Sequence, residues 1–217
     1  NYNFNMINIT FPDGANKNYE NGVSVIEVAK SISEGLSRNV LSAKFNNKTV
    51  ETSTLLESDG DIIFFTWNDD EGKSAFWHSS AHVLAEAIMD IYPHAKLTIG
   101  PSIENGFYYD ADFGDISFSE KDLMGLETKF MELARKKSVF KMRSSTKSDA
   151  LSYYRDINNE YKIELINGLE DGSITFCDHS NFTDLCRGGH IPNTGLIKAV
   201  KLTSVAGAYW RGNETRN

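Results

Sequence analysis

The sequence predicts an α+β protein in which a small β-grasp, ubiquitin-like domain precedes a larger α/β domain. The first part, about 65 residues long, places short strand patterns around a single helix. A polar stretch at 68–72 follows, and beyond it the hydrophobic periodicity becomes mainly helical. We therefore expect one domain at residues 1–67 and a second at residues 73–217.

The first domain is expected to open with a β-hairpin and one helix. Residues 7–20 contain two strand patterns on either side of Asp13-Gly14, a common hairpin turn. Ser24 and Glu27 have the spacing of a capping box, which predicts the start of a helix. The order hairpin, helix and further strands is that of a β-grasp fold.

The rest of this domain shows no sign of catalysis. The helix is expected to end at Gly35, and short strands are expected at 43–45, 49–50 and 62–66. The domain contains no histidine or cysteine, and its carboxylates lie at turns or in the helix cap. We therefore expect it to have a structural or docking role.

The second domain is expected to contain several helices. The first runs from 74 to 92 and is stopped by Pro93, and a shorter one starts at Ser148. Another starts at Ser119, and Asp122 is placed to close a capping box with this serine. Between the helix at 74–92 and the helix that starts at Ser119, the glycines and aromatic residues of the segment 100–110 predict a hairpin.

Two pairs of reactive side chains stand out in this domain. Histidines four residues apart on a helix share a face, and two glycines can bend a Cys-x-x-x-His segment so that its two side chains face them. The lack of a glutamate after the first histidine excludes the H-E-x-x-H pattern of metalloproteases. The candidate groups are His78, His82, Cys186 and His190.

Three other residues of these types have simpler explanations. Cys177 and His179 form a competing pair, but they adjoin an apolar and aromatic stretch and are expected to pack within a strand. His94 follows Pro93 and is expected to lie at a helix end.

Charge and cysteine content limit the class of protein. The formal net charge of −8 argues against nucleic-acid binding by bulk electrostatics. The segment 186–217 is an exception, since it carries five basic residues and one acidic residue. Two cysteines, the lack of a leader pattern and the lack of a long apolar run predict a reduced, cytoplasmic protein without a membrane span.

Four motifs carry a family resemblance. The segments HSSAHVLAEAI, GPSIENGFYYD, TDLCRGGHIP and SVAGAYWRG resemble, in this order and spacing, the amino-terminal half of bacterial threonyl-tRNA synthetases. The resemblance implies a TGS domain, which has a β-grasp fold, followed by the second-and-additional, or editing, domain that alanyl-tRNA synthetases share in kind. In that family the aminoacylation core and the anticodon-binding domain follow the last motif, so we expect no ligase activity from this chain.

The implied activity is proofreading. A site that holds the threonine hydroxyl cannot reject serine well, because one methylene is worth only about 1–3 kcal/mol. The resemblance therefore implies a second site that hydrolyses mischarged seryl-tRNA(Thr) by attack of water on the aminoacyl ester.

The resemblance also assigns roles to residues of this chain. His78 is suited to proton transfer, and Lys162 to holding a water or the developing oxyanion. The implied catalytic residues are His78, His82, Lys162, Cys186 and His190; the implied substrate-binding residues are Gly100, Pro101, Tyr109 and Asp184; and Lys201 and Arg211 are the expected contacts to the tRNA backbone.

Cofactors and partners follow from the same resemblance. Three histidines and a cysteine could hold zinc, as in the alanyl relatives, but we favour a metal-free water mechanism. The full-length enzyme would use ATP, magnesium and a separate zinc. The expected partners are the acceptor end of tRNA(Thr) and the rest of the synthetase chain. The full-length enzyme is expected to be a homodimer and the fragment a monomer.

Two alternatives remain open. One is a zinc-dependent aminoacyl-tRNA hydrolase of the alanyl type, which metal content and substrate preference would distinguish. The other is a non-catalytic RNA-binding or regulatory module built on the TGS domain, in which the loss of both helix histidines would leave RNA binding intact.

Overall fold

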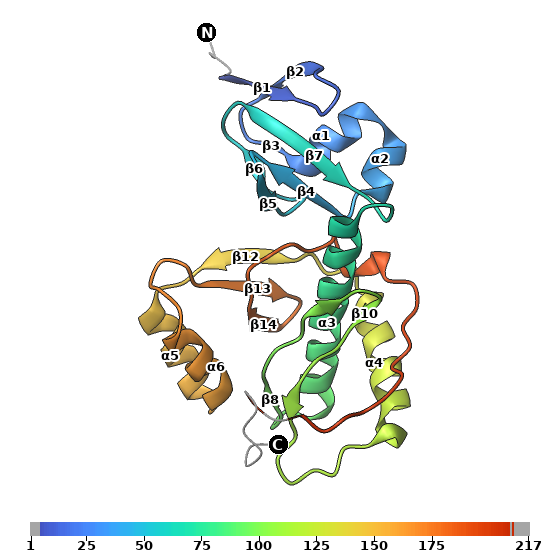
Figure 1. Ribbon diagram of the computed structural model, residues 1–217, viewed down its shortest axis with the longest axis vertical. Coiled ribbons are helices and arrows are strands. Elements are labelled where there is room, and N and C mark those ends of the chain that lie inside the picture. The colour runs from blue at the N-terminus through green and yellow to red at the C-terminus, as the bar shows by residue number, and fades with distance from the viewer. Residues whose placement is uncertain (1–4, 209, 211–217) are drawn as a thin grey trace. The chain divides into compact units, whose positions relative to one another are not determined.

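The computed structural model describes residues 5–208 and 210 of the chain (Figure 1). Contacts divide the chain into two compact units: Asn1–Ser79 with Gly188–Asn193, and Ser80–Arg187 with Thr194–Asn217. These units are not the predicted domains, because the first also takes in 68–79 and 188–193. The division reflects contact density and not independent folding, so the predicted boundary at 67–73 stays a prediction.

The first unit contains a five-stranded mixed sheet with the order β2-β1-β7-β4-β5. β1 pairs in parallel with β7, and the other pairs are antiparallel. This arrangement confirms the β-grasp class. The strands are β1 (Met6–Thr10), β2 (Asn16–Glu20), β4 (Ser42–Phe45), β5 (Lys48–Val50) and β7 (Gly60–Phe65), and β3 (Val23–Ser24) pairs separately with β6 (Leu55–Leu56).

The apolar face of α1 (Val25–Ile32) packs against this sheet. The alternation of β1 buries Ile7 and Ile9 on one face, where they join Val25 and Val28 of the helix and Ile62 of β7 in one hydrophobic core. The core therefore uses the strand period of two and the helix period of 3.6 that the sequence shows.

The predicted helix in this unit is confirmed at its start and wrong at its end. The capping box is present, since Ser24 and Glu27 exchange hydrogen bonds between side chain and backbone. The helix ends at Ile32 and not at Gly35, which lies inside a second helix, α2 (Glu34–Asn39). The reason is Ser33, whose hydroxyl accepts a hydrogen bond from the N–H of Leu36 and so starts a new helix.

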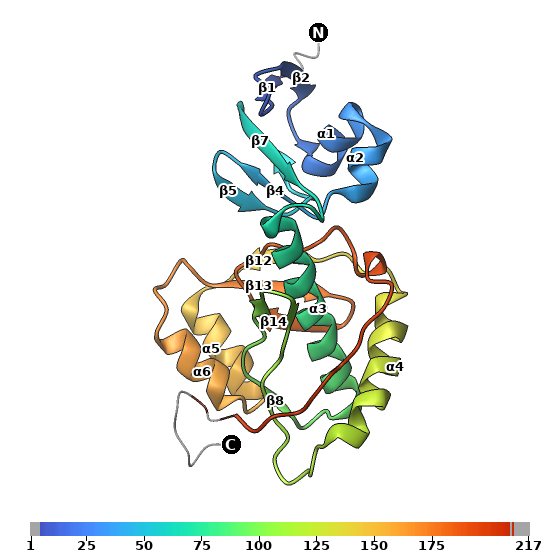
Figure 2. The ribbon, with the colours of Figure 1, turned by 45° about the vertical axis from the view of Figure 1, so that its right-hand side comes forward.

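α3 (Asp70–Ile91) is the longest helix among the described residues (Figures 1 and 2). It begins four residues before the predicted start at 74, so part of the supposed linker at 68–72 is helical. Asp69, just before the helix, accepts hydrogen bonds from the backbone and hydroxyl of Thr66. Asp70 and Glu71 in the first turn suit the positive end of the helix dipole.

The second unit contains a three-stranded antiparallel sheet, β12-β13-β14, with two helices beside it. α5 and α6 lie side by side in both views (Figures 1 and 2). Tyr154 of α5, Ile166 of α6 and Phe176 of β13 belong to one buried cluster. The elements are β12 (Lys141–Ser144), α5 (Lys147–Asp156), α6 (Glu160–Asn167), β13 (Thr175–His179) and β14 (Phe182–Leu185).

Short paired segments and α4 (Leu123–Ala134) complete this unit. The predicted hairpin at 100–110 is present as β9 (Ser102–Ile103) and β10 (Gly106–Phe107). The predicted capping box at Ser119 is also present, although its first turn is a 3-10 helix, Glu120–Asp122. The remaining elements are β8 (Lys96–Leu97), its antiparallel partner β11 (Ala111–Asp112) and a 3-10 turn, Thr194–Leu196.

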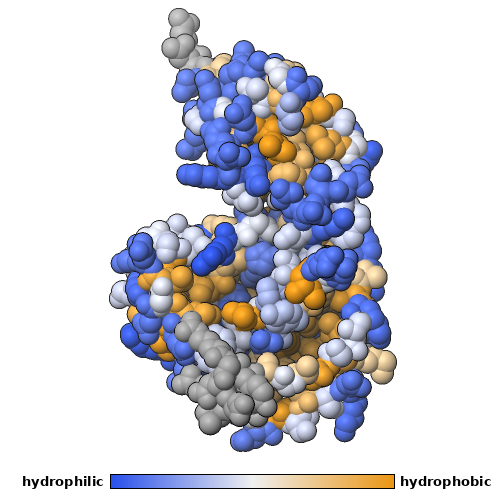
Figure 3. All heavy atoms as spheres, viewed as in Figure 1, coloured by the Kyte–Doolittle hydropathy of each residue, from blue (hydrophilic) through white to orange (hydrophobic). Residues whose placement is uncertain are grey.

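The surface is mostly polar on the face drawn in Figure 3, with hydrophobic residues gathered in separate patches. Among the described residues, no helix has both the length and the apolar character needed to cross a membrane.

Candidate functional site

Two histidines occupy successive turns of α3, because four residues make about one helical turn. The ring of His78 stacks on that of His190, with 4.7 Å between ring centroids and 24° between planes. The Nδ1 atom of His78 lies 3.3 Å from the carbonyl oxygen of Gly189. A carbonyl can only accept, so Nδ1 donates and the lone pair of the neutral ring resides on Nε2.

His190 follows two glycines whose backbone geometry explains their presence. Gly188 and Gly189 have φ angles of 92° and 89°, a region that side chains with a Cβ rarely adopt. The two residues therefore form the bend that the sequence predicts between Cys186 and His190.

Glu51, in the segment between β5 and β6, binds this bend. Its carboxylate accepts hydrogen bonds from the backbone of Gly189 and from both the backbone and the ring Nδ1 of His190. Burial alone would raise the pKa of Glu51, but these hydrogen bonds and the nearby His190 ring hold that pKa below its usual value. Glu51 is thus an ionised acceptor at neutral pH.

His82 and Cys186 form the second pair. The Nε2 atom of His82 lies 3.3 Å from the sulfur of Cys186, and both side chains are buried. Cys186 directly follows β14, where its N–H donates to the carbonyl of Thr175 and its carbonyl accepts from the hydroxyl of Thr175. The edge of the small sheet therefore fixes the position of the thiol.

The two pairs belong to one group of possible ligands. The side-chain nitrogen and sulfur atoms offered by His78, His82, Cys186 and His190 all lie within 4.8 Å of one another. Three imidazoles and one thiol are donors that zinc accepts in tetrahedral sites, so this set of side chains fits a zinc ion. It also fits a water held between a base and its neighbours, and the chemical role of the group stays a prediction.

A buried ionic network lies in the second unit around Asp184, on β14. The carboxylate is 2.6 Å from the Nζ atom of Lys162, on α6, and both side chains are almost fully buried. Asp184 also accepts hydrogen bonds from the hydroxyls of Tyr109, at 2.6 Å, and Tyr154, at 3.1 Å. The structure thus brings together three of the predicted residues, and it adds Tyr154, which no motif in the sequence marks.

Both tyrosines of this network stay protonated. Burial, and then the negative charge of Asp184, raise the pKa of Tyr109 and the pKa of Tyr154 well above the usual value. Each hydroxyl can therefore donate to Asp184 over the whole physiological pH range. The Lys162 ammonium also lies 3.4 Å from the Tyr109 hydroxyl, so it is oriented by two partners.

Gly100 lies against the ring of Tyr109. A Cβ atom at position 100 would be 2.1 Å from Cδ2 of that ring, far closer than any real contact. The resemblance implies that Gly100 contacts the substrate, and in the structure the Tyr109 ring also occupies the space that a side chain at position 100 would need. The next residue, Pro101, offers its carbonyl to the N–H of Tyr108 at 3.5 Å.

The remaining histidines and the second cysteine lie as the sequence predicts. Cys177 and His179 are buried in β13, which confirms that they pack within a strand. The ring of His179 also has a partner that the sequence did not suggest, since its Nδ1 atom lies 3.2 Å from a carboxylate oxygen of Glu86 on α3. His94 is exposed just beyond the end of α3.

The expected tRNA contacts are only partly described. Lys201 is exposed, and its Nζ atom lies 3.2 Å from a carboxylate oxygen of Glu127. The same carboxylate accepts a hydrogen bond from the N–H of Leu202. Arg211 lies outside the described residues.

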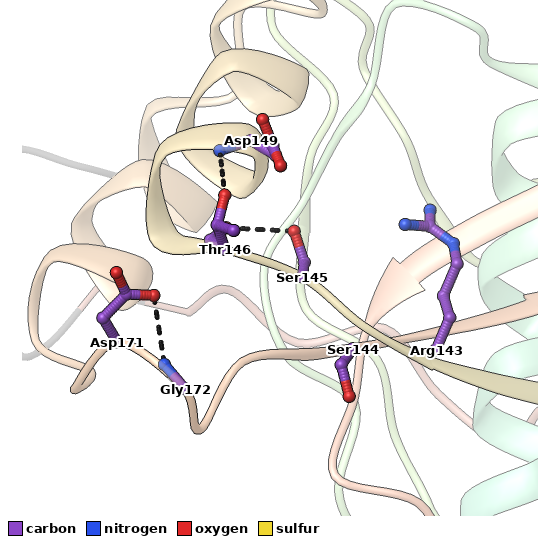
Figure 4. Close-up of a pocket in the computed structure, with 7 residues that line it drawn as sticks. All are labelled: Arg143, Ser144, Ser145, Thr146, Asp149, Asp171 and Gly172. Atoms are coloured by element: carbon purple, nitrogen blue, oxygen red, sulfur yellow. Dashed lines mark hydrogen bonds between the residues drawn. The ribbon is translucent and has the colours of Figure 1, made fainter.

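A pocket of about 430 Å³ opens where β12 ends and α5 begins (Figure 4). None of the predicted site residues lines it. Arg143 at its edge is bound to Asp178 and lies over the ring of Phe176. The pocket therefore offers no candidate for the predicted chemistry.

Comparison with known proteins identifies two families along the chain. Residues 7–66 match the TGS domain, and residues 174–216 match the second additional domain of threonyl and alanyl tRNA synthetases. The first match coincides with the β-grasp sheet. The second includes β13, β14, Asp184, Cys186 and His190.

Curated relatives extend the similarity over almost the whole chain. Threonine–tRNA ligases of Flavobacterium psychrophilum, Cytophaga hutchinsonii and Porphyromonas gingivalis are 62%, 56% and 50% identical to it, over 96%, 96% and 97% of its length. The chain spans 32% of the length of each of these relatives. With its TGS domain and its synthetase second additional domain, the chain thus matches the amino-terminal part of the threonine–tRNA ligases.

Proposed function

We propose that this chain proofreads for a threonine–tRNA ligase by hydrolysing mischarged seryl-tRNA(Thr). The observation that carries the proposal is the group formed by His78, His82, Cys186 and His190, in a chain that matches these ligases. The proposed partners are the acceptor end of tRNA(Thr) and the remainder of a ligase chain, which would supply the aminoacylation activity.

Such an activity meets a chemical need of any threonine-specific ligase. Serine keeps the hydroxyl of threonine and lacks only a methyl group, which a binding site can distinguish by about 1–3 kcal/mol. A second site that accepts the smaller serine ester and excludes threonine removes the error. Gly100 and Tyr109, which lie against each other, are the residues that we propose to form the wall that the extra methyl group would meet.

The proposed reaction is attack of water on the carbonyl carbon of the seryl ester. The Nε2 atom of His78 takes a proton as the water oxygen bonds to carbon, since Nδ1 is already donating to Gly189. The tetrahedral intermediate then breaks its bond to the ribose oxygen, which receives a proton. The products are free serine and tRNA(Thr).

Lys162 is proposed to hold the water or stabilise the oxyanion. Its ammonium has three donors, and the network around Asp184 keeps it oriented in the folded chain without reorganisation during the reaction.

The direct test compares two esters under single-turnover conditions. We expect the purified chain to deacylate seryl-tRNA(Thr) faster than threonyl-tRNA(Thr), because only the larger ester meets the pocket wall. Equal rates for both esters would contradict proofreading by size.

Replacing the proposed base is the second test. His78→Ala should lower the rate for seryl-tRNA(Thr) by about 10²–10⁴-fold and leave the affinity for tRNA nearly unchanged. His94→Ala is the matched control, because it removes an exposed histidine just beyond the same helix. Loss of tRNA binding in His78→Ala, or an undiminished rate with all tRNA bound, would rule out this role for His78.

A zinc-dependent hydrolase of the alanyl type is the second candidate, and the donor set supports it. If a zinc ion were bound by His78, His82, Cys186 and His190, it would lower the pKa of a bound water. Metal analysis of the purified chain and its activity after chelation distinguish the two. We expect the chelated chain to keep its rate, and a loss that added zinc restores would favour the second candidate. A chain that binds RNA without deacylating either ester would instead be a non-catalytic module.

A further inference from the structure

Glu51 contacts the candidate site, although no motif in the sequence connects it with that site. It lies within the segment matched by the TGS domain, between β5 and β6, and 139 positions before His190. Its side chain is nevertheless only 12% exposed, and that of His190 is fully buried. A carboxylate is rarely buried to this extent unless its oxygens are hydrogen-bonded.

The contacts use both oxygens of the carboxylate. Oε1 is 2.8 Å from the backbone nitrogen of Gly189 and 3.1 Å from Nδ1 of His190, and Oε2 is 3.1 Å from the backbone nitrogen of His190. An ionised carboxylate only accepts, so Nδ1 of His190 must carry the proton. The lone pair of the neutral ring is then placed on Nε2.

These contacts reach two of the candidate catalytic groups. Glu51 holds the backbone of the bend and the ring of His190 directly. The carbonyl of Gly189, in the same bend, accepts from Nδ1 of His78, and the two imidazole rings are stacked. One carboxylate thus fixes His190 and supports the anchor that sets the tautomer of His78.

We propose that Glu51 is a positioning residue for the hydrolytic site, which it serves by holding the bend and by setting the ring tautomer and orientation of His190. The proposal rests on the proposed function for its effect on rate. It gives the TGS segment a part in the reaction that is distinct from docking. A glycine-rich bend has little conformational restraint of its own, which explains why an external carboxylate would be needed.

The test replaces Glu51 by its isosteric amide. Glu51→Gln leaves one acceptor oxygen where there were two, so its NH₂ group must face at least one of the three N–H donors. We expect the single-turnover rate for seryl-tRNA(Thr) to fall by about 10–100-fold, as for other residues that orient imidazoles, with the affinity for tRNA within about twofold of wild type. Glu57→Gln is the control, since Glu57 is an exposed glutamate that directly follows β6.

Nitrogen-15 NMR of the histidine rings gives a second readout, which does not depend on activity. In the wild-type chain, His190 should show a protonated Nδ1. In Glu51→Gln the population of this tautomer should fall. A cooperative thermal unfolding transition checks that the variant is folded. A lower rate with unchanged His190 signals would mean a merely structural role and overturn the proposal. A changed tautomer with an unchanged rate would overturn it as well.

The two proposals can fail separately. If the wild-type chain deacylates neither ester, the proposed function is wrong, and the His190 signals alone decide whether Glu51 sets the tautomer. If Glu51→Gln does not fold, Glu51→Asp carries the same test, because it keeps the charge and moves both oxygens back by one methylene. Unchanged His190 signals in that variant would overturn the proposal.

Discussion

Gly100 has no side chain, and this leaves room for the ring of Tyr109 in the candidate site. Alanine at this position would place Cβ 2.1 Å from the ring of Tyr109, so the ring must move. Tyr109 donates to Asp184, which in turn binds Lys162. Gly100→Ala should therefore lower the free energy of unfolding by about 1–3 kcal/mol, as overpacking does, and should slow deacylation of seryl-tRNA(Thr).

Urea unfolding and single-turnover deacylation measure these two effects. Gly106→Ala is the control in the same hairpin, because no atom lies within 4 Å of a Cβ built there and its φ angle is not positive. If both variants unfold and deacylate like wild type, the contact between Gly100 and Tyr109 does not matter to the site.

At the level of residues, the sequence predicts groups whose chemistry is visible in a short motif. His78 and His82 are recognisable because four residues make about one helical turn. Glu51 and Tyr154 are not, because each acts through partners far along the chain, and a glutamate in a turn or a tyrosine in a helix has many ordinary uses. Only the fold shows that Glu51 contacts His190 and that the buried Tyr154 contacts Asp184.

Among the elements, α1 offers a direct test of local sequence signals. The hydroxyl of Ser24 accepts from the N–H of Glu27, and the carboxylate of Glu27 accepts from both the hydroxyl and the N–H of Ser24. Ser24→Ala should lower the free energy of unfolding at pH 7 by about 0.5–2 kcal/mol. Ser53→Ala, at an exposed turn, should have little effect.

The same cap should appear in the pH dependence of stability. The hydrogen bonds from Ser24 hold the pKa of Glu27 below its usual value of 4.5. A group whose pKa is lower in the folded state stabilises the fold above its unfolded pKa, and this contribution is lost as the pH falls through the folded pKa. The free energy of unfolding, measured in urea between pH 6 and pH 3, should therefore fall less steeply with decreasing pH for Ser24→Ala than for wild type. If the free energies of unfolding of the two proteins change equally with pH, the Ser24 cap does not lower the pKa of Glu27.

Helix boundaries with a strong local signal, such as a capping box or Pro93, were easier to predict than the others. The start signals at Ser24 and Ser119 were correct because a capping box acts within four residues. Gly35 did not end α1, since a second capping serine came before it. Helix α6 was not predicted, although the side chain of Asn159 caps its start by accepting from the N–H of Lys162. Its eight residues make only about two turns, which is too short for a clear apolar periodicity.

On the scale of the whole molecule, charge opposes the proposed binding of tRNA. The net charge of −8 repels a polyanion, so the affinity of this chain must depend on a local group of cations. Of the two cations that the resemblance assigns to the tRNA backbone, Lys201 lies among the described residues. Its present partner is Glu127, at 3.2 Å, and a phosphate would have to compete with that carboxylate.

The dependence of tRNA affinity on salt tests this arrangement. Each phosphate contact releases about 0.7–0.9 of a counterion, so Lys201→Gln should reduce the slope of log affinity against log salt concentration by about that amount. The loss should be the same for tRNA(Thr) and for a non-cognate tRNA, because phosphates carry no sequence information. Lys121→Gln, which removes an exposed lysine elsewhere in the chain, should keep the wild-type slope. If the two variants have equal slopes, Lys201 stays bound to Glu127 in the complex, and other cations must hold the tRNA backbone.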